Sequence, residues 1–317
     1  MSRILITGGA GYIGSKLAAR LSVFNDVVVF DNLFYDQGPL VAPVFHNSYG
    51  QIKFYNEDIT DWSNNLIREV INADVIIPLA AMVGAPLCER LPEQSTAINY
   101  QWIEDLVARL RGDQLVVYPN TNSGYGSTGS EICTEETPSN PLSLYGTTKQ
   151  KAEDYLLENH ECSICFRLAT VFGWSYRPRT DLLVNNLTKT AFEYNELEIF
   201  DGHFRRNYIH VNDIVRAFEF AIDNRDRMVG NVYNLGNDDI NCTKKDLALK
   251  IRELTGARVI DVKGRTDPDK RDYIVSSDKL TNLGYYCASN LEYGIKEMLY
   301  HYENFHSNLV EDVCKNY

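Results

Sequence analysis

Short apolar runs alternate with amphipathic stretches through the first half of the chain. The runs, rich in Val, Ile and Leu, predict strands at 3–7, 26–30, 75–79 and 114–118, and the stretches between them predict helices at 15–21, 62–71 and 96–110. Strands that alternate with helices are typical of parallel βαβ units. The pattern therefore predicts an α/β fold with a Rossmann-type doubly wound parallel sheet.

The alternation becomes irregular after Gly173, where Pro, Arg and Asp interrupt short helical stretches such as 244–254. We predict a first domain over residues 1–173 and a smaller, mixed α/β C-terminal domain over 174–317. The apolar segments within 211–235 are expected to return to the first domain.

Composition narrows the possible partners. The 317 residues, of which 44% are hydrophobic, can bury one large core, and the formal net charge of −12 argues against nucleic acid as a partner. No apolar run reaches the roughly 18 residues that a membrane span requires. We also find no N-terminal targeting segment, so we predict a cytoplasmic protein with no membrane partner.

The seven cysteines include a C-x-x-C pair, Cys162 and Cys165. A zinc site would need further ligands at a matching spacing, and no second pair is present in the sequence. The pair lies in an apolar alternating stretch that predicts a strand. We interpret these residues as reduced core cysteines rather than as a redox motif, and we expect no metal.

The first predicted strand ends in a glycine-rich turn with Gly8, Gly11 and Gly14, followed directly by a predicted helix. Glycines let the backbone approach a pyrophosphate, and the free N–H groups of a helix start bind the anion. Asp31 ends the second strand, where a carboxylate accepts hydrogen bonds from ribose hydroxyls and repels a 2′-phosphate. The pattern favours NAD over NADP; the alternative is a glycine-rich turn with an unrelated Asp.

Two further segments fit a dinucleotide lying across the strand ends. Asp58 could accept a hydrogen bond from the adenine amino group while Ile59 packs on the ring, although Asp58 could equally cap a helix. Leu79, Ala80 and Ala81 close another strand with mostly small side chains, which allow close approach of a cofactor.

Tyr145 and Lys149 lie one helical turn apart, so both side chains share a face. An ammonium near a phenol favours the phenolate, which makes Tyr145 a general base. Hydroxyl residues follow the strand upstream, and we choose Thr121 over Ser123 as the group that binds the reacting oxygen and relays its proton. The predicted catalytic residues are Thr121, Tyr145 and Lys149.

Together, Thr7–Gly14, Asp31–Asn32, Asp58–Ile59, Tyr145-x-x-x-Lys149 and Arg206–Asp213 resemble the NAD-dependent epimerase/dehydratase family, the extended short-chain dehydrogenases. The resemblance implies a tightly bound NAD, a Rossmann domain and a substrate domain, and oxidation of a nucleotide-linked sugar, usually at C4. It adds Tyr12, Ile13 and Asn32 to the cofactor residues. Tyr145 and Lys149 also count as cofactor residues, with Lys149 binding the nicotinamide ribose. The substrate residues it implies are Met82, Asn122, Ser123, Asn185, Arg206, Arg271 and Asp272.

Departures from the family pattern select among its reactions. Dehydratases of the family usually carry an acidic pair after the catalytic Thr, where this chain has Asn122 and Ser123. A 4-epimerase or a 4-dehydrogenase is left, the latter with a keto acid as an external oxidant. The runs 31–37 and 121–126 resemble GDP-manno-heptose 4-dehydrogenases of capsule polysaccharide biosynthesis. The alternatives are a UDP-hexose 4-epimerase and a non-catalytic NAD-binding regulatory protein.

Family members pair through two helices per subunit, here 98–110 and 143–157. The resemblance therefore implies a homodimer or a homotetramer.

Overall fold

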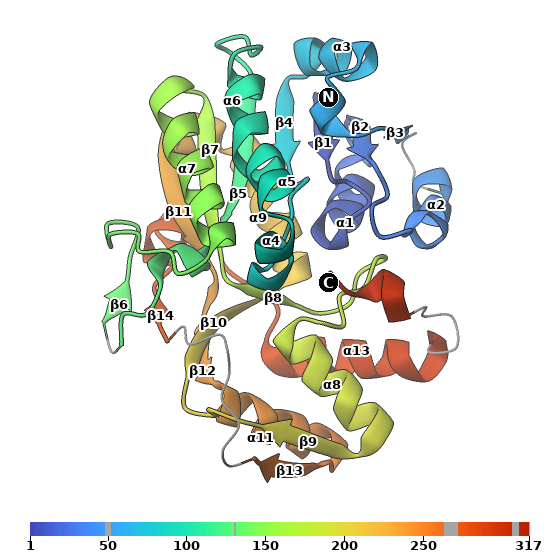
Figure 1. Ribbon diagram of the computed structural model, residues 1–317, viewed down its shortest axis with the longest axis vertical. Coiled ribbons are helices and arrows are strands. Elements are labelled where there is room, and N and C mark those ends of the chain that lie inside the picture. Colours follow the sequence, from blue (N-terminus) through green and yellow to red (C-terminus); the bar gives the residue numbers. More distant parts are fainter. Residues whose placement is uncertain (48–51, 130, 263–271, 306–310, 317) are drawn as a thin grey trace.

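A seven-stranded parallel sheet forms the centre of the protein (Figure 1). The structure is a computed structural model and describes residues 1–47, 52–129, 131–262, 272–305 and 311–316. The strand order is β11-β7-β5-β4-β1-β2-β3. These strands are β1 (Arg3–Thr7), β2 (Asp26–Asp31), β3 (Lys53–Asn56), β4 (Val75–Pro78), β5 (Leu115–Thr121), β7 (Ser163–Leu168) and β11 (Asn231–Leu235). The predicted doubly wound sheet is confirmed.

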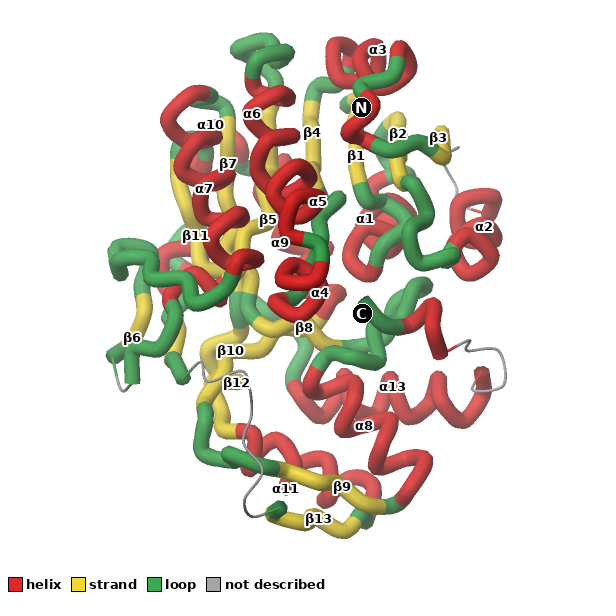
Figure 2. Tube along the Cα trace, viewed as in Figure 1, coloured by secondary structure: helices red, strands yellow, loops and turns green. Residues whose placement is uncertain are grey.

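Helices cover both faces of this sheet (Figure 2). Alternate residues of a strand point to opposite faces, so Ile4 and Ile6 pack with one helix layer and Leu5 packs with the other. The first layer contains α1 (Tyr12–Leu21), α2 (Gly38–Asn47) and α9 (Val211–Asp223). The second contains α3 (Asn64–Asn72), α6 (Trp102–Val107) and α7 (Leu144–Asn159).

The segment predicted as one helix at 96–110 is divided. It consists of α5 (Pro92–Thr96), a π-helical turn η2 (Ala97–Gln101) and α6, and it is preceded by α4 (Ala85–Arg90). A π turn adds one residue to a helical turn, which hydrophobic periodicity does not reveal. Shorter elements nearby are η1 (Ile59–Asp61) and η3 (Asn122–Tyr125).

The second part of the molecule lies below the carboxyl ends of the main sheet (Figure 1). Its strands form a three-stranded sheet, β12-β10-β8, and two strand pairs, β13-β9 and β14-β6. They are β6 (Ile132–Cys133), β8 (Thr170–Phe172), β9 (Glu196–Ile199), β10 (Arg205–His210), β12 (Asn237–Thr243), β13 (Arg258–Asp261) and β14 (Ile274–Val275). The helices α8 (Leu183–Tyr194), α11 (Lys244–Thr255) and α13 (Leu291–Phe305) supply its separate apolar core.

Three short elements complete the described chain, α10 (Arg225–Met228), α12 (Asp278–Thr281) and η5 (Glu311–Cys314). Among the described residues, no helix is long and apolar enough to cross a lipid bilayer.

The loop after β8 is bonded directly to the start of α1. The Tyr12 hydroxyl donates to the Gly173 carbonyl at 2.7 Å, and the Ser175 hydroxyl donates to the Tyr12 carbonyl at 2.6 Å. The hydroxyl oxygens of Ser15 and Ser175 are 3.3 Å apart. This joint fixes the second part of the chain against the glycine-rich turn.

A buried ion pair fastens α7 to the sheet. Glu153 in α7 accepts a hydrogen bond from the Arg167 guanidinium in β7 at 2.7 Å and another from the Asn120 amide at 2.6 Å. Arg167 also donates to the Tyr125 hydroxyl at 3.1 Å, which donates to Asn234 at 2.6 Å. Five elements, α7, β7, β5, η3 and β11, are thus linked through one charged pair.

Replacing Glu153 by Gln is expected to lower the free energy of unfolding by about 3–5 kcal/mol, because Arg167 would keep its buried charge without a carboxylate. Urea unfolding measures the loss. Glu196→Gln, in the exposed pair with Arg258, is the control and should cost less than about 1 kcal/mol. Equal losses in the two variants would contradict the structural role given to Glu153.

Candidate active site

A cavity of about 930 Å³ opens at the carboxyl ends of the parallel strands. The strand order reverses between β1 and β4, and ligands of doubly wound sheets bind at such a reversal. The volume is near the upper end of the range for small-molecule sites. The predicted residues that line the cavity are Gly8, Gly11, Tyr12, Ile13, Gly14, Asp31, Asn32, Asp58, Ile59, Leu79, Ala80, Ala81, Met82, Thr121, Ser123, Tyr145 and Lys149.

The glycine-rich turn is packed too tightly for side chains. Gly8 has a φ of +70°, and a Cβ atom there would lie 2.5 Å from the backbone nitrogen of Ala80. A Cβ atom on Gly14 would lie 2.3 Å from the Gly8 carbonyl oxygen. The helix α1 begins at Tyr12 with no side-chain cap, so its first N–H groups remain available to an anion. These features fit the pyrophosphate of a dinucleotide.

Asp31 is buried at the end of β2 and is held by three donors. Its carboxylate accepts from the backbone N–H groups of Ala10 at 3.0 Å and Leu33 at 2.9 Å, and from the Gln37 amide at 3.1 Å. Burial raises the pKa of Asp31, although these hydrogen bonds oppose the rise. The carboxylate is thereby fixed at the position from which ribose hydroxyls can be bound.

Asp58 lies in the cavity wall and also caps a short helical turn. It lines the cavity, and its carboxylate also accepts from the Thr60 N–H at 2.9 Å, which caps η1. The Asn32 amide donates to the other carboxylate oxygen at 2.7 Å. Burial would raise the pKa of Asp58, but the hydrogen bonds from Thr60 and Asn32 outweigh it and lower the pKa. The two cofactor candidates Asn32 and Asp58 are therefore joined by a hydrogen bond.

The three catalytic candidates line the same cavity. Thr121 ends β5, and its hydroxyl donates to the Ser123 hydroxyl at 3.0 Å while accepting from the Ser123 N–H at 3.1 Å. Tyr145 lies in the first turn of α7, which Ser143 caps through a bond from the Gly146 N–H at 3.2 Å. The pair of hydroxyls at the end of β5 and the phenol at the start of α7 thus border one space.

Lys149 is 3% exposed and lies one turn beyond Tyr145. Its ammonium nitrogen is 4.0 Å from the centroid of the Tyr118 ring. Burial lowers the pKa of Lys149 to about 7, with the negative charge of Glu153 opposing the shift. A lysine with this pKa can exchange its proton near neutrality, which suits a group that adjusts the charge of a neighbouring phenol.

Two of the substrate candidates lie in the cavity wall. Met82 is buried there, and its backbone N–H and carbonyl are both bonded to the Asn99 amide, at 2.9 Å and 3.0 Å. Ser123 is the other. Asn122 is fully buried outside the lining, and its side-chain amide has no hydrogen-bond partner among the described residues.

Three further substrate candidates, Asn185, Arg206 and Asp272, lie outside the lining. Asn185 bonds to the backbone of Gly173 at 3.0 Å and to that of Arg179 at 2.9 Å, so it supports the loop behind the cavity. Arg206 lies with its guanidinium 5.6 Å from the Tyr273 ring centroid, and Tyr273 is the residue that reaches the cavity. Asp272 pairs with Arg205 at 2.9 Å. Arg271 lies outside the described residues.

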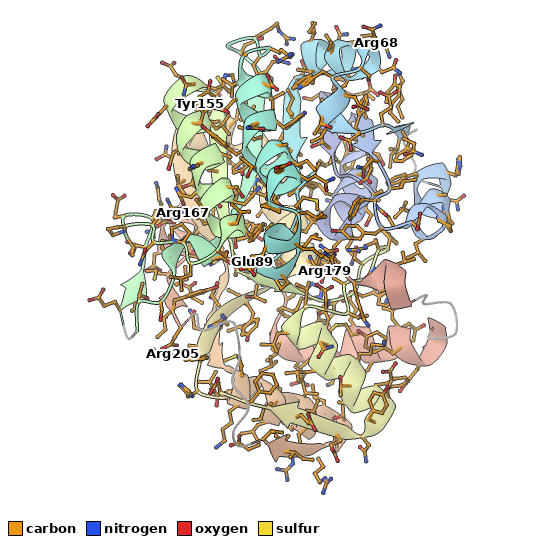
Figure 3. All side chains as sticks on the ribbon, in the orientation of Figure 1. Arg68, Glu89, Tyr155, Arg167, Arg179 and Arg205 are labelled. Atoms are coloured by element: carbon orange, nitrogen blue, oxygen red, sulfur yellow. The ribbon has the colours of Figure 1, made fainter. Side chains whose placement is uncertain are left out.

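Sequence reasoning did not find several residues of the lining. Tyr35, Gln37, Glu89, Arg177 and Asn316 all border the cavity. Figure 3 shows Glu89 and also Arg179 near the boundary between the two parts of the molecule, with Arg205 at an outer edge. The two arginines on either side of Pro178 could have indicated an anion-binding loop in the sequence. Asn316 belongs to no recognisable motif. Within the described ranges, no group of His, Cys, Asp and Glu is placed to hold a metal ion.

Comparison with known proteins identifies the family. The model of the NAD dependent epimerase/dehydratase family matches residues 4–236, so this chain belongs to that family. The UDP-glucose 4-epimerase of Corynebacterium glutamicum is 24% identical over 87% of this chain and 88% of the relative. The mouse dTDP-D-glucose 4,6-dehydratase is 27% identical over 96% and 90%. A crystal structure of dTDP-glucose 4,6-dehydratase from Bacillus anthracis in complex with NAD superposes with a TM-score of 0.81, at 25% identity and over 97% and 98% of the chains.

Replacing Lys149 by Met is expected to stabilise the cofactor-free protein at neutral pH. Folding lowers the pKa of Lys149 from 10.5 to about 7, so the unfolded chain binds more protons between these values. The penalty of the buried charge is complete below pH 7 and disappears as the pH rises toward 10.5.

Urea unfolding of the cofactor-free variant should show a gain of at most about 5 kcal/mol at pH 7 that shrinks by pH 10. Lys151→Met, exposed on the same helix, is the control. A gain in the free energy of unfolding that did not depend on pH would show that the buried charge of Lys149 is not its cause.

Proposed function

We propose that this protein oxidises the C4 hydroxyl of a nucleotide-activated sugar with a bound NAD. The observation that carries the proposal is that one cavity is bordered by both the glycine-rich turn with Asp31 and the Thr121, Tyr145 and Lys149 side chains. The two relatives compared above are named as a UDP-glucose 4-epimerase and a dTDP-D-glucose 4,6-dehydratase. The complete set of catalytic side chains argues against a purely regulatory NAD-binding protein.

The bound NAD would accept hydride from the sugar carbon. Gly8, Gly11 and Gly14 would bring the backbone close to its pyrophosphate, and Asp31 would accept from a ribose hydroxyl. Asn32 and Asp58 would border the adenine.

The proton of the C4 hydroxyl passes to this chain's own residues. Tyr145 as phenolate removes it, with the Thr121 hydroxyl binding the same oxygen and relaying the proton. The Thr121 to Ser123 hydrogen bond of 3.0 Å fixes the direction of the Thr121 oxygen. Lys149 shares the face of α7 with Tyr145, and its ammonium form stabilises the phenolate.

The residue after Thr121 favours a reaction without elimination. A 4,6-dehydratase needs an acid and a base beside C5 and C6 of the sugar, and here Asn122 is buried outside the cavity lining. Ser123, which does reach the cavity, is not a carboxylic acid. A 4-epimerase or a 4-dehydrogenase is therefore the proposed activity. The runs 31–37 and 121–126 make a GDP-heptose the first substrate to test, with a UDP-hexose as the alternative.

The reaction is tested by identifying the cofactor that copurifies and then incubating the protein with GDP- and UDP-sugars in deuterated water. Redox-neutral conversion between two C4 epimers would establish an epimerase. Formation of a keto sugar with NADH, consumed on addition of a keto acid, would establish a 4-dehydrogenase. The absence of any C4 epimer and of any keto sugar with every such substrate would contradict both.

Tyr145→Phe is expected to lower turnover by at least about 100-fold, because the general base is removed, while NAD content stays unchanged. Turnover is followed by product formation in a coupled assay or by mass spectrometry. Tyr155→Phe is the matched control on the same helix, since Tyr155 lies outside the cavity lining and toward the outer end of α7 (Figure 3). Retention of more than a few per cent of turnover by Tyr145→Phe would refute the assignment.

A further inference from the structure

Two arginines from the second part of the chain enter the cavity beside the glycine-rich turn. Arg177 and Arg179 both line it, and they follow Ser175, the residue whose hydroxyl is bonded to the Tyr12 carbonyl at the start of α1. Asn185 bonds to the Arg179 carbonyl at 2.9 Å and fixes the same loop. The loop 173–179 therefore brings positive charge to the place where α1 presents its free N–H groups.

Arg177 is 2% exposed and keeps its charge among neutral acceptors. In the described chain its guanidinium donates to the carbonyls of Val313 at 3.0 Å and Lys315 at 2.9 Å, and to the Asn316 side-chain oxygen at 2.7 Å. Burial and, next, the positive charge of Arg179 lower the pKa of Arg177 to about 10. At neutral pH the side chain is a buried cation whose bonded partners do not neutralise it.

Arg179 differs because it already has a carboxylate. Its guanidinium donates to both oxygens of Asp181, at 2.8 Å and 3.1 Å from Nε. Residues 177–181 thus hold two cations and one carboxylate, and that carboxylate is hydrogen-bonded to Arg179. A buried charge without a partner is costly, and a ligand that supplies an anion removes that cost.

The position of Arg177 identifies which part of a ligand it would meet. Its guanidinium lies over the Tyr35 ring, 4.5 Å from the centroid, and Tyr35 follows closely after Asp31. The positive charge of Arg177 also acts on Asp31, where it opposes the rise of the carboxyl pKa. Arg177 therefore lies at the end of the cavity that Tyr35 and Asp31 border.

We propose that Arg177 binds the pyrophosphate of the dinucleotide and slows its release. This inference rests on the proposed function. The C-terminal residues 313–316 hold the guanidinium in place, since they supply its three acceptors and are themselves tied to the loop by the Thr180 N–H, which donates to the Cys314 carbonyl at 2.9 Å. Figure 1 shows this end of the chain between the sheet and α13. Residues 313–316 thus become part of the proposed cofactor site.

The first test is Arg177→Met in the full-length protein, with Arg205→Met, outside the cavity, as the control. The affinities of NAD, ADP-ribose and adenosine are measured by calorimetry on cofactor-stripped protein, together with the NAD content after purification. The affinities of NAD and ADP-ribose should fall by about 10- to 100-fold, because a charge-assisted bond to phosphate is lost. Adenosine, which has no phosphate, should bind as before.

The second test is Asn316→Asp, which keeps both Arg177 and the side-chain volume. The new carboxylate would neutralise the buried guanidinium, so the free energy of unfolding should rise while the affinity for NAD falls at least about 10-fold. Asn304→Asp, exposed on α13, adds the same charge and should change the affinity less than about 2-fold. Because Asn316 itself borders the cavity, the loss of affinity supports the role of Arg177 only when the free energy of unfolding rises with it.

A folded Arg177→Met or Asn316→Asp protein that binds NAD as tightly as the wild type would overturn the assignment of Arg177. A wild-type protein that binds no NAD would instead overturn the proposed function. The two failures are therefore distinguishable.

Discussion

The buried pair of Glu153 and Arg167 is the interaction on which the catalytic side of the structure depends. A helix that lies on a sheet can slide or rotate when only apolar contacts hold it, because those contacts have no direction. A carboxylate with a fixed guanidinium and a fixed amide allows one arrangement. Since Tyr145 and Lys149 are on the same helix, the geometry of the proposed general base is set by a charge pair deeper in the protein.

The parts of the site that sequence reasoning found are those encoded locally. The turn at Gly8 and Gly14 and the Tyr145 to Lys149 spacing are each contained in one strand end or one helical turn, and the sheet follows from β-branched runs. The π turn at 97–101 was missed because it leaves the apolar pattern almost unchanged. Arg177 and Asn316 were missed because they meet across 139 positions of sequence.

The cavity has one wall that carries charged side chains and another that is mostly apolar. Its dinucleotide end has Asp31 and Asp58 on the sheet side and arginines on the opposite loop, whereas the wall near Met82 is largely apolar. The expected phosphate residues Arg206 and Asp272 are engaged elsewhere, in contacts with Tyr273 and Arg205.

The π turn η2 also bears on how this cavity can change in evolution. Ala97 and Ile98 line the cavity, while Asn99 in the same turn bonds to the Met82 backbone. Deleting one residue here would replace the π turn by a regular α-helical turn. The side chains of α5 would then rotate about the helix axis by about 100° relative to those of α6. The loss of a single codon could thus change which side chains line the cavity beside Met82, without replacing any of the proposed catalytic residues.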